Sequence, residues 1–134
     1  MKIKIERRHS KAVIPKHETA GAAGLDLTAV TKEEELYYTS YDTGIAVAIP
    51  EGYVGLVFPR SSISKLPGIS LANAVGVIDS DYRGTIQLRF RGNRYEVGER
   101  VGQLVVMPYA QVEFEEDYLD DTDRGQGGFG STNN

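Results

Sequence analysis

The sequence contains no cysteine, so a disulfide, a thiolate zinc site and a cysteine nucleophile are all excluded. It has no apolar run that approaches the roughly 20 residues of a membrane-spanning helix. The basic start, MKIKIERRHSK, lacks the apolar segment of a secretory signal. What is present is ordinary: 134 residues, of which 40% are hydrophobic and 25% charged. This composition predicts one globular domain in the cytoplasm, with no membrane partner.

The negative charge is concentrated near the end of the chain. Residues 113–123 contain seven acids and neither lysine nor arginine, so with a net charge of −4 the rest of the chain carries +3. That excess does not form the basic stripe of a protein that binds duplex nucleic acid, and we expect no nucleic-acid polymer as a partner. Small anionic ligands remain candidates.

Apolar and polar residues alternate with a period of two along much of the chain, which predicts β-strands. The alternation covers residues 3–6, 45–49 and 86–91, and the last of these indicates a half-exposed strand. Residues 52–58 and 104–107 are mostly apolar, so we expect these two strands to be more fully buried.

Glycine and proline separate these strands at short intervals, for example at Pro50-Glu51-Gly52 and Pro67-Gly68. No stretch of 12 residues has the apolar spacing of a helix, and we expect only a turn or two of helix, at residues 62–65. Many short strands joined by such turns predict an all-β fold: a sandwich, a barrel or a jelly roll.

Two polar segments are candidates for binding phosphate. Pro59-Arg60-Ser61-Ser62 follows a predicted buried strand directly, and an arginine, two hydroxyls and backbone N–H groups at a strand end suit a phosphate cradle. Gln103, at the start of a later strand, could donate a further hydrogen bond. An ordinary polar turn and a polar strand start are the respective alternatives.

Two acids are candidates for chemistry. Residues 73–84 have the pattern of a β-hairpin with Asp79 at its mouth, between Ile78 and Tyr82. Partial desolvation between apolar neighbours would make this carboxylate a better general base, whereas a turn aspartate that only accepts backbone N–H bonds is the alternative. Asp26, between two leucines, could face Mg2+ through water or be purely structural.

The last eleven residues, 124–134, interrupt the strand pattern with four glycines in positions 125–130. We expect a single domain over 1–123 followed by a segment that is mobile on its own. A disordered tail is one interpretation. A lid over a nucleotide is the other, built from a cation, a glycine nest, an aromatic ring and two hydroxyls: Arg124, Phe129, Ser131 and Thr132.

Taken together, these segments resemble the homotrimeric dUTP diphosphatase (dUTPase) family. The five motifs occur in the family's order and cover nearly the whole chain: 23–27, 59–62, 73–84, 98–103 and 124–132. The most specific are Gly-Val-Ile-Asp-Ser-Asp-Tyr-Arg-Gly and the terminal Arg-Gly-x-Gly-Gly-Phe-Gly-Ser-Thr. The resemblance implies a jelly-roll-like β-clip subunit. It also implies three active sites at subunit boundaries, with the tail of one chain closing over a site built by the other two.

The resemblance further implies hydrolysis of dUTP to dUMP and diphosphate with Mg2+, by water attack on the α-phosphorus. This reaction lowers the concentration of dUTP and supplies dUMP, the precursor of dTMP. Asp79 would orient and deprotonate the water, Tyr82 would pack on the deoxyribose, and Asp26 would lie near the metal. The substrate-binding residues that the resemblance implies are Arg60, Ser61, Ser62, Asn73, Gly76, Val77, Ile78, Tyr82, Gln87, Gln103, Arg124, Phe129, Gly130, Ser131 and Thr132.

Two alternatives to this function remain. The dCTP deaminases resemble the chain in the same hairpin, but they carry a catalytic glutamate where Arg89 stands here. A regulatory binding protein that retains the fold is the second alternative, against which the intact Asp79 and tail argue. Many dUTPases have glycine in place of Ser62, whose backbone N–H still allows the phosphate role. The source also remains open: a cellular enzyme would be cytoplasmic, a viral one would act in the host cytoplasm or nucleus.

Overall fold

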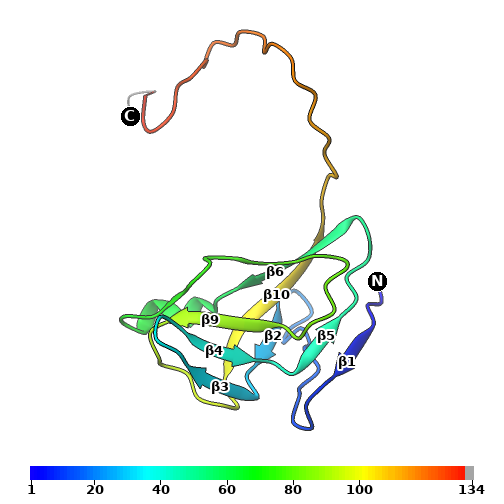
Figure 1. Cartoon of the computed structure of the whole chain (residues 1–134), viewed down its shortest axis with the longest axis vertical. Helices are drawn as coiled ribbons and strands as arrows, with labels where there is room; N and C mark the ends of the chain where they lie inside the picture. The colour runs from blue at the N-terminus through cyan, green and yellow to red at the C-terminus, as the bar shows by residue number, and fades with distance from the viewer. Residues whose placement is uncertain (132–134) are drawn as a thin grey trace.

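The computed structural model describes residues 1–131, and within them the chain forms ten short strands and one 3-10 helix (Figure 1). The elements are β1 (Ile5–Arg7), β2 (Leu25–Thr28), β3 (Thr31–Glu34), β4 (Thr39–Asp42), β5 (Ile45–Val47), β6 (Tyr53–Phe58), η1 (Ser61–Lys65), β7 (Ser70–Leu71), β8 (Gly76–Ile78), β9 (Gln87–Arg91) and β10 (Arg100–Pro108). The turn or two of helix expected at residues 62–65 is therefore confirmed, with η1 beginning one residue earlier. In the described part of the chain, no helix is long and apolar enough to cross a membrane.

The strands form two four-stranded sheets and one two-stranded pair, all antiparallel. The first sheet has the order β2-β10-β6-β8, the second has the order β3-β4-β9-β7, and β1 pairs with β5. In Figure 1, strands β9, β4 and β3 form a layer in front of β10 and β6. The apolar faces of the two sheets enclose one core, to which each contributes fully buried side chains such as Leu27 and Leu88.

The half-exposed strand predicted at 86–91 is confirmed. Leu88 and Phe90 of β9 are buried, whereas Gln87, Arg89 and Arg91 between and beside them are exposed. The two runs predicted to be more fully buried are less so, because β6 alternates between buried and half-buried residues. The prediction of burial is wrong at Met107, which is 44% exposed near the C-terminal end of β10.

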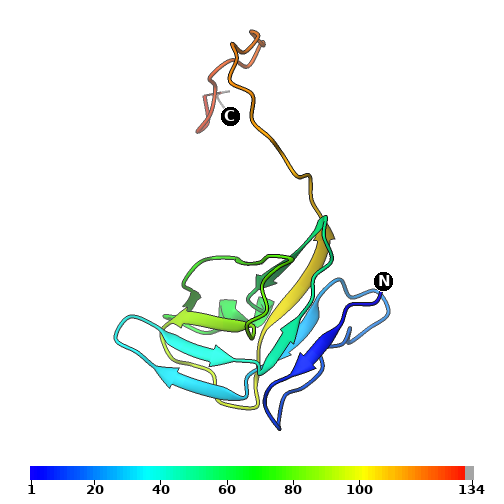
Figure 2. The same ribbon diagram turned by 45° about the vertical axis from the view of Figure 1, so that its right-hand side comes forward.

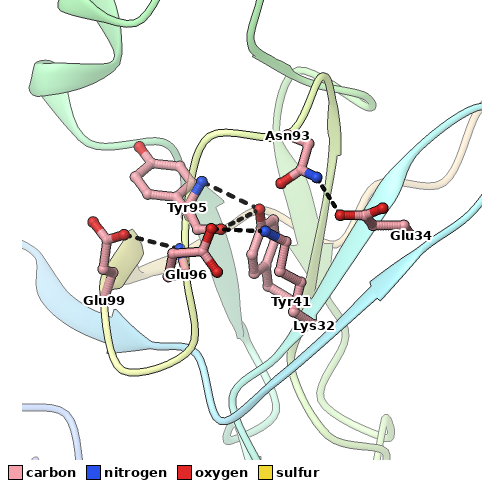
Figure 3. A network of polar contacts seen from close by, with 7 residues as sticks. All are labelled: Lys32, Glu34, Tyr41, Asn93, Tyr95, Glu96 and Glu99. Atoms are coloured by element: carbon pink, nitrogen blue, oxygen red, sulfur yellow. Dashed lines mark hydrogen bonds and ion pairs between the residues drawn. The ribbon is translucent and has the colours of Figure 1, made fainter.

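A cluster of aromatic rings fills one end of the core. Tyr41, Phe90 and Tyr95 meet edge to face, with ring centroids 5.4–5.9 Å apart, a favourable geometry for aromatic pairs. The Tyr41 hydroxyl donates to the Tyr95 carbonyl oxygen at 2.9 Å (Figure 3). Burial raises the pKa of both Tyr41 and Tyr95. Around them, Figure 3 shows the pairs Lys32–Glu96 and Asn93–Glu34, which join β3 to the loop after β9.

The hairpin predicted over 73–84 is wrong. β8 pairs with β6, with Gly76 opposite Val57, whereas β9 pairs with β4 and β7 in the other sheet. Residues 79–86 therefore cross from one sheet to the other instead of turning back on a neighbour. Alternation identifies which face of a strand is buried, but it carries no information on which strand lies beside it.

After β10 the chain leaves the body as an extended arm, drawn in orange to red in Figures 1 and 2. Every side chain from 109 to 126 is exposed, including Phe114 at 95%. The strand body thus ends at Pro108. The domain boundary at 123 and the mobility of the tail stay predictions, and Thr132 lies outside the described residues.

Candidate active site

Strand register brings three of the five motifs to one end of the first sheet. In β10, Gln103 lies opposite Asp26 of β2 on one side and Phe58 of β6 on the other. The polar segment that starts with Arg60 follows β6 at once, and η1 begins at Ser61. A carboxylate, an amide, a guanidinium and hydroxyls therefore gather within one small region, which we call the phosphate end.

Gln103 links the motifs at the phosphate end through direct contacts. Its Nε2 donates to the carbonyl oxygen of Pro59 at 3.3 Å. Its side chain also lies across Gly24, so closely that a Cβ at position 24 would be 2.2 Å from the Gln103 Oε1. A side chain at position 24, two residues before Asp26, would thus displace the Gln103 amide. The second Nε2 hydrogen of Gln103 is available to a phosphate oxygen.

Asp26 is paired with an arginine of the 98–103 motif to which the sequence interpretation gave no role. Arg100, at the start of β10, places its guanidinium 3.3 Å from the Asp26 carboxylate and 3.5 Å from that of Glu18. The Asp26 side chain is 23% exposed, so a hydrated ion can still approach it. Spacing in the sequence gives no signal for this pair, because Asp26 and Arg100 become neighbours only through the pairing of β2 with β10.

The phosphate end fits Mg2+ only in a limited way. Residues 1–131 contain no group of three or more His, Cys, Asp or Glu side chains that could hold the ion. Mg2+ keeps several waters and commonly binds through one or two carboxylates plus substrate phosphates. The single carboxylate of Asp26 beside a phosphate cradle suits that second arrangement.

Asp79 lies elsewhere. It follows β8, and with Ser80, Val54 and Tyr109 it lines an open cavity of about 690 Å³ at the opposite end of β6. Because Ile78 pairs with Gly55, Asp79 comes level with Val54, four residues before Phe58. Asp79 is therefore roughly 13 Å along the sheet from the phosphate end, at about 3.3 Å per residue. The expected shielding between apolar neighbours is wrong for a single chain, since Asp79 and Tyr82 are both exposed.

The segment expected to contact uracil is an edge strand. β8 is the last strand of its sheet, so in the described part of the chain one row of Gly76–Ile78 backbone groups has no strand partner. Unpaired N–H and C=O groups in a row can read the edge of a base. On the other sheet, Asn73 and Gln87 line a second cavity of about 390 Å³, together with Tyr38, Ala72, Arg89 and Arg91.

The tail residues that the structure describes, 124–131, are not brought to any of these places. Arg124 bonds within its own turn, where its Nε donates to the Gly127 carbonyl oxygen at 2.9 Å. Phe129, Gly130 and Ser131 are exposed at the far end of the arm (Figure 2). Within one chain, the predicted residues therefore form separate partial sites rather than one pocket.

Comparison with known proteins gives consistent matches. The dUTPase family model matches residues 10–133. The chain is similar to the deoxyuridine 5'-triphosphate nucleotidohydrolase of Finegoldia magna, with 42% identity over 98% of this chain and 99% of that protein. The corresponding protein of Cutibacterium acnes is 43% identical over 89% of this chain and 84% of its own length.

Solved structures share the fold. The dUTPase of Staphylococcus bacteriophage 80alpha, bound to dUpNHpp, has a TM-score of 0.85 at 23% identity, covering 98% of both chains. The dUTPase of phage phi11, in which a structural Mg(II) ion is coordinated, has a TM-score of 0.76 at 21% identity over 87% of this chain and 97% of that one. The expected jelly-roll-like, nearly all-β fold is confirmed.

Proposed function

Since this chain belongs to the dUTPase family and is a deoxyuridine 5'-triphosphate nucleotidohydrolase that uses Mg2+, we propose how its residues divide the work. The enzyme converts dUTP to dUMP and diphosphate. We place the reaction in sites shared among three copies of the chain, in the cytoplasm, where nucleotide triphosphates are made and used.

One observation supports the proposal of a shared site: in a single chain, roughly 13 Å of sheet separates Asp79 from the phosphate end. A water held by Asp79 could not reach an α-phosphorus whose neighbouring phosphates lie on Arg60 and Gln103 of the same chain. A symmetric oligomer removes this difficulty, because Asp79 of one copy then faces the phosphate end of the next. The homotrimer is the oligomer that the motifs predict.

Base recognition and water activation fall to the segment around β8. The unpaired backbone of Gly76–Ile78, with the Asn73 amide, binds the uracil edge, and Tyr82 packs on the deoxyribose, where a 2'-hydroxyl would not fit. Cytosine presents the reverse donor and acceptor pattern at position 4, and each mismatched buried polar group costs about 1–3 kcal/mol. Asp79 orients the attacking water and accepts its proton, a role that contributes about 10²- to 10⁴-fold in rate.

The phosphate end of a second copy binds the triphosphate. Arg60 supplies a fixed positive charge, and the hydroxyls and N–H groups of Ser61 and Ser62 donate hydrogen bonds, with the Gln103 amide beside them. Bound Mg2+ supplies further positive charge that offsets the phosphates and the developing charge on the leaving diphosphate. Asp26 would hold a water of that ion, and Arg100 fixes the direction of the Asp26 carboxylate.

The tail of a third copy closes the site. Residues 109–123 are extended and could span up to about 50 Å, enough to cross a neighbouring subunit. Arg124, Ser131 and Thr132 would then bind the terminal phosphate, and Phe129 with Gly130 would cover the base. Closure excludes water that would otherwise compete with the protein's hydrogen bonds.

The deaminase alternative has no support in the site. Arg89 lies exposed on the outer face of β9, with its guanidinium 4.5 Å from the centre of the Tyr38 ring. No carboxylate occupies that position to move protons for deamination.

The test is incubation with dUTP, dCTP, dTTP and UTP, each with Mg2+, followed by chromatography of the products. We expect dUMP and diphosphate from dUTP, and turnover of the other three nucleotides lower by at least about 100-fold. Release of dUTP from dCTP would indicate a deaminase, and equal hydrolysis of all four would contradict the assigned base recognition.

A further inference from the structure

The segment 79–86 carries the base Asp79 and the sugar contact Tyr82, yet it belongs to neither sheet. It crosses between them after β8 and before β9, and Asp79 and residues 81–83 in its first part are exposed. Catalysis needs Asp79 in a fixed position, because a displacement of about 1 Å can cost a hundredfold in rate. The position must therefore come from contacts other than strand pairing, within and around the segment.

The far end of the segment is held by the core. The Thr85 hydroxyl donates to the Asp42 carboxylate at 2.9 Å, and the Tyr82 hydroxyl donates to the Thr85 carbonyl oxygen at 2.9 Å. The next carbonyl, of Ile86, accepts from the buried Thr43 hydroxyl at 2.7 Å. These contacts anchor the segment from residue 85 onward.

The near end is held by Arg83. Its Nη1 donates to the carbonyl oxygen of Ser80 at 2.7 Å and to that of Tyr82 at 3.1 Å. Both acceptors belong to the turn that begins at Asp79, where the Tyr82 N–H donates to the Asp79 carbonyl oxygen at 3.2 Å. The Arg83 carbonyl in turn accepts from Arg8, next to β1, at 2.5 Å. A single exposed side chain thus holds two carbonyl oxygens of the turn.

We propose that Arg83 is a positioning residue for the reaction: its guanidinium fixes the Asp79–Tyr82 turn and thereby the direction of the Asp79 carboxylate. Arg83 acts through the turn and touches no reacting atom. The inference rests on the proposed role of Asp79. Because the segment is anchored separately at Thr85 and Ile86, loss of the Arg83 contacts should loosen the turn without unfolding the chain.

The test compares Arg83→Met with a matched control, Arg94→Met. Arg94 is also exposed and also donates to a backbone carbonyl oxygen, that of Pro67 at 3.2 Å, but it lies outside the segment. We expect Arg83→Met to lower kcat for dUTP by about tenfold or more, with KM within about threefold and Tm within about 2 °C of the parent enzyme. Arg94→Met should leave all three values unchanged, and Arg83→Lys should restore part of kcat.

A double variant separates positioning from other roles. If Arg83 acts through Asp79, adding Arg83→Met to Asp79→Asn should lower kcat no further. Three results would each overturn the inference. In the first, the losses in kcat from the two substitutions multiply; in the second, Arg83→Met has a kcat within twofold of the parent. In the third, a fall in Tm and trimer content accounts for the lost activity. Normal turnover by Asp79→Asn alone would instead contradict the proposed function.

Discussion

Replacing Gly24 by alanine tests the geometry of the phosphate end without removing any of its functional groups. The new Cβ would lie 2.2 Å from the Gln103 Oε1, whereas ordinary contacts begin at 3.4 Å, so the amide must move by about 1.2 Å. The amide is the flexible end of a side chain and can rotate away. Its hydrogen bond to the Pro59 carbonyl oxygen, already 3.3 Å long, would then be lost.

The expected effect falls on catalysis more than on stability. Loss of one neutral hydrogen bond lowers the free energy of unfolding by at most about 1.5 kcal/mol. Loss of a donor to a charged phosphate costs about 1.5–3 kcal/mol, which corresponds to about a 10- to 100-fold lower kcat/KM for dUTP. Steady-state hydrolysis and thermal melting measure the two quantities side by side.

Gly21→Ala is the matched control, because a Cβ at position 21 has no atom within 4 Å. It should leave kcat/KM unchanged. A kcat/KM within twofold of the parent in Gly24→Ala would refute the reasoning. So would an undiminished effect of Gly24→Ala when Gln103 is already alanine, since the two changes act on the same amide.

Three further predictions address the base, the tail and the core. Asp79→Asn should lower kcat by about 100-fold or more while KM stays within about tenfold, as measured by steady-state kinetics; normal turnover would show that Asp79 is only a turn residue. A chain that ends at Asp123 should keep its trimer by light scattering and its Tm without ligand, but lose most of its turnover; equal turnover would show that the tail is not a lid. The Tyr95 hydroxyl is buried without a hydrogen-bond partner in the described residues, so Tyr95→Phe should leave Tm unchanged or higher. Burial raises the pKa of Tyr95 above its ordinary value of 10.0, so the folded chain holds a proton that the unfolded chain releases. Stability should therefore fall above pH 10, and less steeply in Tyr95→Phe, when Tm is measured from pH 9 to 11; an equally steep fall in both would contradict this.

The faces of the strands could be predicted from the sequence, but their partners could not. Alternation at 86–91 identified the buried Leu88 and Phe90 correctly, because side-chain burial repeats every two residues in a strand. The same pattern gave no indication that β8 and β9 lie in different sheets. Pairing between β2 and β10, more than 70 residues apart, depends on the whole core rather than on any local signal.

The candidate site divides in a similar way between residues that the sequence names and residues that it does not. Residues that would touch substrate stand in recognisable motifs, so Arg60, Asp79 and Gln103 could be named from the sequence. Residues that hold these in place, such as Arg100 beside Asp26 and Arg83 within its turn, could not be named, because their partners are set by tertiary pairing and by backbone carbonyls. Spacing in a sequence indicates neither the tertiary pairing nor the contacts to backbone carbonyls.

The central claim, a site shared between chains, is tested most directly by mixing two inactive variants. Asp79→Asn removes the proposed base, and Arg60→Met removes a proposed phosphate contact. Each variant alone should form inactive trimers. The two chains are unfolded, combined in equal amounts and refolded together, with each variant refolded alone as the control.

If Asp79 and Arg60 of one site come from different chains, a quarter of the sites in the mixture contain both residues unchanged. The mixture should then recover about a quarter of the parent activity. If both residues of a site come from the same chain, every site in the mixture carries a defect. Activity no higher than that of the separate variants, in mixed trimers verified by mass, would contradict the account.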